Sequence, residues 1–271
     1  MTGWAWDETL FAGSAEHYES GRVAYPPELA HAIRDELGLD GTGSLLDLGC
    51  GPGSLTRLLA PYFARAVGAD ADPGMVAAAA RLAPGIEWHV LRAEELPAGL
   101  GQFRVVSFAQ SFHWMDQPLV AERVRGMLTP DGAWVHVGAL THRGVPGDDE
   151  LPLPRPPWDA VEELIRSYLG PVRRAGRGTL PEGAKGGEED VMRAAGYHGP
   201  VRLVPWPGAV VERDTQALVS SVYSMSYATP NLFGPRRPAF ESDLRRLLAA
   251  ASPSGRFAER IRPMEAVIWR P

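Results

Sequence analysis

The sequence of 271 residues contains a single cysteine, Cys50. One cysteine excludes a disulfide within the chain and is typical of proteins kept in a reducing compartment. No apolar run reaches the roughly 18 residues that a membrane-spanning helix needs. The first residues lack the basic start and the apolar core of a signal peptide. We therefore expect a cytoplasmic protein with no membrane partner.

An excess of basic residues is also missing. The chain has 27 Lys and Arg against 33 Asp and Glu, a net charge of −6, without a long run of either sign. Proteins that bind nucleic acid through its phosphates usually carry a basic face, so no nucleic-acid partner is expected. The seven histidines show no pairing with metal-ligand spacing, so no metal is expected. Nothing in the composition indicates an oligomeric state.

What the sequence does contain is an alternation of apolar strand patterns with helical patterns. Helices are expected over about residues 26–37, from Ser54, after Asp72 and over about Pro118–Leu128. Strands are expected at Ser44–Leu48, Arg65–Asp70, Ile86–Leu91, Phe103–Ala109 and Gly132–Leu140. Mostly apolar strands that alternate with helices predict an α/β fold, a parallel sheet covered by helices on both faces.

The alternation divides the chain into four expected segments. Residues 1–40 form an irregular arm and a helix, and residues 41–140 form the core. Residues 141–200, rich in Pro, Gly and Arg, are expected to cover the edge where open α/β sheets bind ligands. Residues 201–271 complete the sheet with strands at Val201–Trp206 and Met264–Trp269, and helices near Asp214–Ala228 and Pro238–Ala251 lie between these strands.

The stretch LLDLGCGPGSLTRLLA joins the first strand to a helix through three glycines. Gly49, Gly51 and Gly53 let a ligand approach the backbone closely, and the helix behind them offers free N–H groups. Asp70 ends the second strand, where a carboxylate can bind ribose hydroxyls. The glycines have the alternative of forming a tight turn that binds no ligand. Asp70 has the alternative of capping the next helix. Asp72 fills that second role better, so the pattern favours a nucleotide site.

The spacing of the glycines argues against a nicotinamide cofactor. The dinucleotide pattern is G-x-G-x-x-G, whereas this chain has Gly49, Gly51 and Gly53, with Pro52 where that helix would begin to present its amides. Asp47 stands two residues before the first glycine, where it suits a ligand with an ammonium group better than a pyrophosphate. Alternatively, Asp47 bonds only the amides of the loop.

Four segments in order, LLDLGCGPGSLTRLLA, VGADADPGMV, RAEELP and VVSFAQSFHWMD, resemble the class I S-adenosylmethionine-dependent methyltransferases. The resemblance is to the small-molecule branch with the trans-aconitate and ubiquinone/menaquinone-type enzymes, and it covers about Phe11 to Leu140. It implies S-adenosyl-L-methionine as cofactor and a Rossmann-like sheet of seven strands in the order 3-2-1-4-5-7-6, the last antiparallel.

The resemblance also implies the residues of the cofactor site. Asp47 and the glycine loop would hold the methionine part, Asp70 the ribose and Met75 the adenine, and Arg22 would pair with the methionine carboxylate. Many relatives have an acid where this chain has Arg92. The expected cofactor site comprises Tyr18, Arg22, Asp47, Gly49, Gly51, Asp70, Ala71, Met75, Ala93, Glu94 and Gln110.

Candidates for the acceptor side follow the fourth strand and lie in the C-terminal region. His113 is a candidate base or orienting group, and Trp114 a candidate pocket wall. Tyr223 and Tyr227, four residues apart, are expected on one helix face as further wall, or else as ordinary core. The sequence SFHW replaces the signature of base-modifying amino methyltransferases. We therefore expect a small organic acceptor with a hydroxyl, amine, carboxylate or activated carbon, by analogy a secondary metabolite.

Two other functions fit parts of the pattern. A nicotinamide-dependent oxidoreductase has a similar sheet, but the glycine spacing disfavours it. A protein of the same fold that binds S-adenosylmethionine as a scaffold, or catalyses a rearrangement without methyl transfer, would carry the same binding residues.

Overall fold

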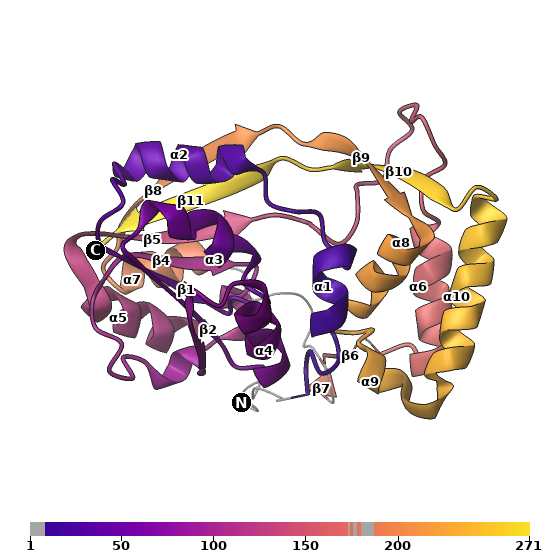
Figure 1. Cartoon of the computed structure of the whole chain (residues 1–271), viewed down its shortest axis with the longest axis horizontal. Helices are drawn as coiled ribbons and strands as arrows, with labels where there is room; N and C mark the ends of the chain where they lie inside the picture. Colours follow the sequence, from indigo (N-terminus) through magenta and orange to yellow (C-terminus); the bar gives the residue numbers. More distant parts are fainter. Residues whose placement is uncertain (1–8, 173, 176–177, 180–186) are drawn as a thin grey trace. The chain divides into compact units, whose positions relative to one another are not determined.

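The structure, a computed structural model, describes residues 9–172, 174–175, 178–179 and 187–271. The chain divides into two compact units (Figure 1). The sheet unit comprises Tyr25–Ala139, Glu182–Pro207 and Pro263–Pro271. The helical unit comprises Met1–Ala24, Leu140–Pro181 and Gly208–Arg262.

The sheet unit is built on seven strands. They are β1 (Ser44–Leu48), β2 (Arg65–Asp70), β3 (Glu87–Val90), β4 (Phe103–Ala109), β5 (Leu128–Gly138), β8 (His198–Trp206) and β11 (Met264–Arg270). Their order is β3-β2-β1-β4-β5-β11-β8. The first five are parallel, and β11 runs antiparallel to both β5 and β8. Numbered along the chain, this is the order 3-2-1-4-5-7-6, so the expected fold class is confirmed.

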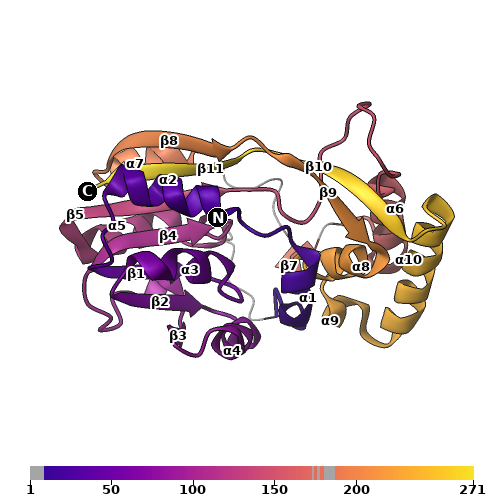
Figure 2. The same ribbon diagram turned by 45° about the horizontal axis from the view of Figure 1, so that its top comes forward.

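Helices cover both faces of this sheet (Figure 2). On one face Leu45 and Val105 pack with apolar residues of α2 (Pro27–Leu37) and α3 (Ser54–Leu59). On the other face Leu46 and Val106, each the next residue along its strand, pack with α5 (Gln117–Met127) and α7 (Glu188–Ala194). Successive side chains of a strand point to opposite faces, so strands covered on both faces are mostly apolar.

The remaining helical segments of the sheet unit are α4 and three short 3-10 turns. The Asp72 carboxylate accepts hydrogen bonds from the backbone N–H groups of Gly74 and Met75 at 2.7 and 3.0 Å, and it caps α4 (Pro73–Leu82) as expected. Three short 3-10 turns follow strands or helices: η1 (Ala60–Tyr62), η2 (Ala93–Glu95) and η3 (Phe112–Trp114).

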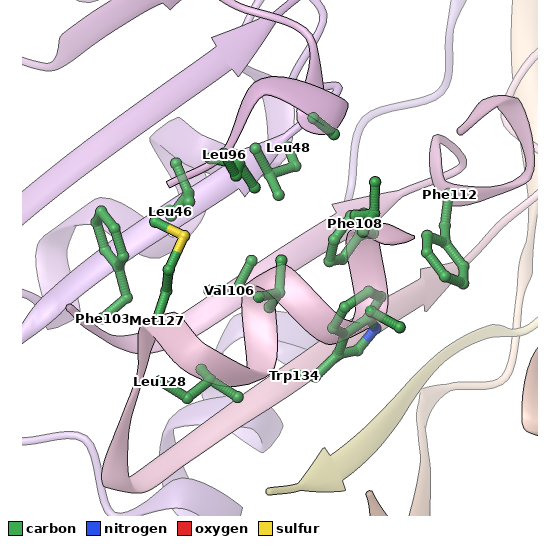
Figure 3. Packing of buried hydrophobic residues seen from close by; sticks show 14 of the residues in the cluster. Leu46, Leu48, Leu96, Phe103, Val106, Phe108, Phe112, Met127, Leu128 and Trp134 are labelled. Atoms are coloured by element: carbon green, nitrogen blue, oxygen red, sulfur yellow. The ribbon is translucent and has the colours of Figure 1, made fainter. Parts of the chain in front are cut away.

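An aromatic cluster lies on the α5 and α7 face of the sheet (Figure 3). The rings of Phe108 and Trp134 stack with centroids 4.0 Å apart, and Phe112 meets Trp134 edge-on at 4.9 Å. The imidazole of His136 packs against Phe112 at 5.0 Å and edge-on against Trp134 at 5.2 Å. The imidazole of His136 is therefore part of this aromatic cluster.

The helical unit has its own apolar core, formed mainly by helices and closed by a two-stranded antiparallel sheet. The helices of this unit are α1 (Ala15–Gly21), α6 (Trp158–Leu169), α8 (Thr215–Tyr223), α9 (Pro230–Phe233) and α10 (Arg237–Ala251), with the 3-10 turn η4 (Gly234–Arg236). The strands of the sheet are β9 (Ala209–Asp214) and β10 (Arg256–Ile261), and a second short pair is β6 (Arg174–Ala175) with β7 (Gly178–Thr179). No helix among the described residues is both long and apolar enough to cross a membrane.

Two expectations about this unit are wrong. The sequence predicts one helix through about Ala228, but α8 ends at Tyr223. The backbone N–H of Ser224 donates to the carbonyls of Ser220 and Ser221, which closes the last turn. Tyr227 therefore does not share a helix face with Tyr223. The sequence also predicts an irregular segment where α1 lies and gives no sign of β9 and β10.

Candidate functional site

The glycine loop after β1 is tied to the end of β2. The N–H groups of Gly49 and Cys50 donate to the carbonyl of Ala69 at 2.8 and 3.1 Å. The N–H of Gly51 donates to one carboxylate oxygen of Asp70 at 2.8 Å, and the N–H of Asp72 donates to the other. These bonds bring together the loop that is predicted to hold the methionine part of the cofactor and the acid that is predicted to bind its ribose.

The backbone of this loop requires glycine. Gly49, Gly51 and Gly53 have φ values of +64°, +55° and +81°, a region that L side chains rarely adopt. At Gly49 a Cβ atom would also lie 2.4 Å from the Cβ of Ser111, so a side chain has no room. The hydroxyl of Ser111 donates to the carbonyl of Leu48 at 2.6 Å and fixes this close approach.

Burial controls the charge of Asp70. The residue is 9% exposed, and removal of the carboxylate from water raises its pKa to about 6, although hydrogen bonds from the N–H groups of Asp72 and Gly51 partly oppose the shift. Asp70 is therefore mostly ionised at pH 7 and loses that charge within the mildly acidic range.

Asp47 lies beneath the loop and has no exposed surface. Its two carboxylate oxygens accept hydrogen bonds from the hydroxyls of Thr56 on α3 and Ser107 on β4, at 2.6 and 2.7 Å. Burial raises the pKa of Asp47 to about 6. The side chain therefore joins β1, α3 and β4. Its partners are these two hydroxyls and the backbone N–H of Thr56 in α3, not the amides of the glycine loop. Contact of Asp47 with an ammonium group stays a prediction.

The residues predicted for the adenine end lie beyond β2 and β3. Ala71 follows Asp70, and Met75, 3% exposed, lies in the first turn of α4. Ala93 and Glu94 lie in η2. A carboxylate oxygen of Glu94 accepts from the backbone N–H of Asp116 at 2.9 Å, which ties η2 to the start of α5. Since β1 to β4 are parallel, these residues share one sheet edge with the glycine loop.

The segment after β4 carries the remaining candidates of the sheet unit. Gln110 has φ +59°, an uncommon value for a residue with a side chain, and such strain often accompanies functional sites. His113 lies in η3, and burial lowers its pKa to about 4, so its imidazole is neutral at pH 7. The ring of Trp114 lies 4.8 Å from that of His113.

A cavity of about 330 Å³ opens beside this segment. Gln110 and His113 line it, as do His136 of β5, Glu188 of α7 and Arg202 of β8. Sequence reasoning missed the last three. His136 could have been found from the sequence, because it is a polar residue within the apolar segment Ala133–Val137. A polar side chain in such a segment often has a role other than packing.

Four predicted site residues belong to the helical unit. Arg22 follows α1, and its guanidinium donates to the hydroxyl and the carbonyl of Ser224 at 2.8 and 2.7 Å and lies 4.7 Å from the ring centre of Tyr18. Tyr223 is fully buried and packs against the stacked rings of Phe233 and Phe240, which matches the alternative of ordinary core.

Tyr227 has a more open place in the same unit. Its hydroxyl donates to a carboxylate oxygen of Glu162 at 2.6 Å, and it lines a cavity of about 240 Å³ together with Glu162 and Arg166. A role of Tyr227 as pocket wall stays a prediction.

Comparison with known proteins shows which family the region with the glycine loop resembles. Residues 45–132 match a family model described as a methyltransferase domain. An uncharacterized methyltransferase of Schizosaccharomyces pombe is 34% identical over 133 residues, which cover 45% of this chain and 49% of that protein. A second from the same organism is 26% identical over 130 residues, 48% of this chain and 52% of that protein. A trans-aconitate 2-methyltransferase of Mycobacterium ulcerans is 28% identical over 158 residues, 54% of this chain and 50% of that protein.

The chain spans about half the length of these curated relatives. The matched part contains the glycine loop, Asp70 and the segment after β4, the same residues that the fold gathers at one sheet edge. Residues 45–132 are therefore a class I S-adenosylmethionine-dependent methyltransferase domain with a Rossmann-like fold.

Proposed function

We propose that the protein transfers a methyl group from S-adenosyl-L-methionine to a small organic acceptor with a hydroxyl, amine, carboxylate or activated carbon, by analogy a secondary metabolite. The observation that carries the proposal is the Asp70 carboxylate, held at the end of β2 by the N–H groups of Gly51 and Asp72. Relatives that are named methyltransferases do not favour the alternative of a scaffold or a rearrangement without methyl transfer.

The residues at this edge fit the cofactor. Asp70 has the acceptor oxygens that ribose hydroxyls require, and Met75 offers a buried apolar contact for adenine. The positive φ of Gly49 and Gly51 keeps side chains away from the methionine end. When bound, the cofactor supplies a methyl carbon already activated by its sulfonium. The task of the protein is then to align the acceptor and to exclude water.

His113 is the side chain that we propose beside the acceptor. As a neutral imidazole at pH 7 it has one nitrogen free to accept a hydrogen bond or a proton, depending on the tautomer. It would orient an acceptor hydroxyl or remove its proton, while an acceptor that arrives without that proton needs only the orientation. We further propose that residues 1–40 cover the cofactor and that residues 141–200 cover the substrate. Of these ranges, residues 1–8, 173, 176–177 and 180–186 lie outside the described residues.

Calorimetric titration with S-adenosylhomocysteine tests the cofactor site. We expect micromolar binding to the wild-type protein and none of NAD at the same concentration. Asp70→Ala removes the acceptor of the ribose hydroxyls and should weaken binding roughly 10- to 100-fold, the effect of one or two hydrogen bonds to a charged group. Binding of NAD in place of S-adenosylhomocysteine would refute the proposal.

The affinity should also depend on pH. Because the pKa of Asp70 is about 6, its carboxylate gains a proton as pH falls from 7 to 5 and loses acceptor capacity. The affinity for S-adenosylhomocysteine should fall roughly tenfold over this interval, in proportion to the ionised fraction. Asp70→Asn should bind weakly and lose less affinity than the wild-type protein over this interval, because only Asp47, whose pKa is also about 6, still gains a proton there. An equal decline in this variant would assign the effect to another group.

A further inference from the structure

The helix α1 lies beside α8 within the helical unit (Figure 1). The two helices approach closely at Gly21, where a Cβ atom would lie 2.5 Å from the carbonyl carbon and oxygen of Ser220. Before α1, the buried hydroxyl of Ser14 donates to the carbonyl of Tyr223 at 2.8 Å. After α1, the guanidinium of Arg22 bonds the segment that follows α8. Groups that do not titrate near neutral pH therefore fasten α1 at both ends.

His17 lies between these two attachments and contacts two other helices. Its Nε2 atom lies 3.4 Å from a guanidinium nitrogen of Arg237 on α10. Its Nδ1 atom lies 3.5 Å from the hydroxyl of Ser220 on α8. The centre of its ring lies 4.9 Å from that of Tyr223, also on α8. One half-buried imidazole thus joins α1 to both α8 and α10.

These contacts determine which ring nitrogen of His17 carries the proton. A guanidinium only donates hydrogen bonds, so Nε2 of His17 is the acceptor of the bond from Arg237. The proton of the neutral imidazole then lies on Nδ1, toward Ser220. A second proton would have to bind at Nε2, where it removes the acceptor and brings two cations together. The arrangement therefore fits the neutral form of His17.

The charged groups that face His17 act in both directions. Burial and then the guanidinium of Arg237 lower the pKa of His17, while Glu16 on α1 and Glu241 on α10 oppose the shift without cancelling it. The titratable group on α8 is the hydroxyl of Tyr223, and burial raises its pKa to about 12, so it stays neutral. The docked helix therefore holds a proton on His17 more weakly than a histidine in water does.

We propose that His17 is a pH-sensitive switch in the packing of α1: its neutral imidazole holds the helix on α8 and α10, and its protonation loosens that packing. The attachments at Ser14 and Arg22 remain in acid, so α1 loosens while the rest of the helical unit stays folded. The inference concerns contacts within the helical unit alone, and it does not rest on the proposed function.

The docked and the detached forms of α1 differ in their affinity for a proton. A detached His17 has the ordinary pKa of about 6.5, and docking lowers the pKa. Above that ordinary value both forms are neutral, so the contact contributes its full stabilisation. As pH falls below it, the detached form takes up a proton more readily and becomes favoured. At pH 5 the ordinary pKa limits the gain in the equilibrium constant for detachment to about thirtyfold.

Hydrogen–deuterium exchange of the full-length protein, measured by mass spectrometry in peptides that cover α1, tests the inference. Exchange times at pH 5 and pH 7 are matched for the intrinsic rate of amide exchange. From pH 7 to pH 5 the protection of α1 should fall by between about threefold and about thirtyfold. The protection of α6, which contains no histidine, should change by less than about twofold.

Two variants assign the change to His17. His17→Gln keeps an acceptor for Arg237 but takes up no proton, so α1 should be protected equally at both pH values, within about twofold. His17→Lys places a permanent cation beside Arg237 and should lower the protection at pH 7 toward the wild-type value at pH 5. His31→Gln is the matched control, because it removes an exposed histidine of α2 in the sheet unit, and it should behave as the wild type.

Three results would overturn the inference. They are a fall in His17→Gln as large as in the wild type, full protection of α1 in His17→Lys at pH 7, and a loss in α6 equal to that in α1. If His17→Lys does not fold, the comparison of the wild type with His17→Gln decides the question. Asp47 and Asp70 also take up protons in this range, but both proteins contain them, so the comparison cancels their effect.

Discussion

Replacing Gly49 by alanine should lower the free energy of unfolding by about 2–5 kcal/mol and abolish measurable S-adenosylhomocysteine binding. Two costs combine. An L residue at φ +64° costs about 1–2 kcal/mol, and a Cβ atom 2.4 Å from that of Ser111 adds about 1–3 kcal/mol of overpacking. Relief of the contact requires the loop to move away from Ser111, which displaces Gly51 from Asp70. Urea denaturation followed by circular dichroism measures the first effect, and calorimetry measures the second.

Gly38→Ala is the matched control. Gly38 follows α2 with φ +60°, but a Cβ atom there meets no other atom within 4 Å. Gly38→Ala should lower the free energy of unfolding only by the backbone cost of an L residue at positive φ, about 1–2 kcal/mol. The affinity for S-adenosylhomocysteine should stay unchanged. Equal losses of stability in both variants would show that the contact with Ser111 is unimportant.

Replacing Arg213 by methionine should destabilise the helical unit by about 3–5 kcal/mol, the usual cost of breaking a buried ion pair from one side. Arg213 and Glu259 are 7% and 2% exposed, with their charged atoms 3.3 Å apart. The guanidinium also donates to the carbonyls of Gly21, His142 and Ala217. Its loss leaves a buried carboxylate and three carbonyls without this donor. The midpoint of urea denaturation measures the effect.

Two further variants test the cause. The double variant Arg213→Met with Glu259→Gln removes the unpaired charge, yet the amide oxygen that replaces the carboxylate can still accept from the N–H groups of Gly144 and Trp158, so part of the stability should return. Arg260→Met breaks an exposed pair with Asp149 and should cost less than about 1 kcal/mol. A comparable loss in Arg260→Met would mean that burial is not what makes the Arg213 pair important.

The sheet unit could be predicted well because its signals are local. The strands β1, β2 and β4 are short, mostly apolar runs next to a turn or a helix start, and Asp72 with Pro73 marks the start of α4. The glycine loop needs positive φ angles, and glycine is the residue that adopts them at low cost. The prediction that Asp70 binds a ribose depends only on its position at the end of a strand.

The helical unit and the cavity beside η3 could not be predicted, because the residues that form them are far apart in the chain. Arg213 and Glu259 resemble solvated charges in the sequence, and only the pairing of β9 with β10 brings them together in the interior. His136 meets Glu188 because α7 packs on the sheet face that His136 occupies. Asp47 has hydroxyl partners on both α3 and β4, which no spacing in the sequence reveals.

The interleaving of the two units has a consequence for synthesis on the ribosome. Each unit is assembled from three separate stretches, so the chain crosses from one to the other repeatedly (Figure 1). Among the described residues, β8 pairs only with β11 in this sheet, and β11 is translated after all the other strands. The nascent chain therefore holds β8 without a neighbour while the whole of α8 to β10 is being made. During that interval its exposed edge is open to chaperones and to other nascent chains.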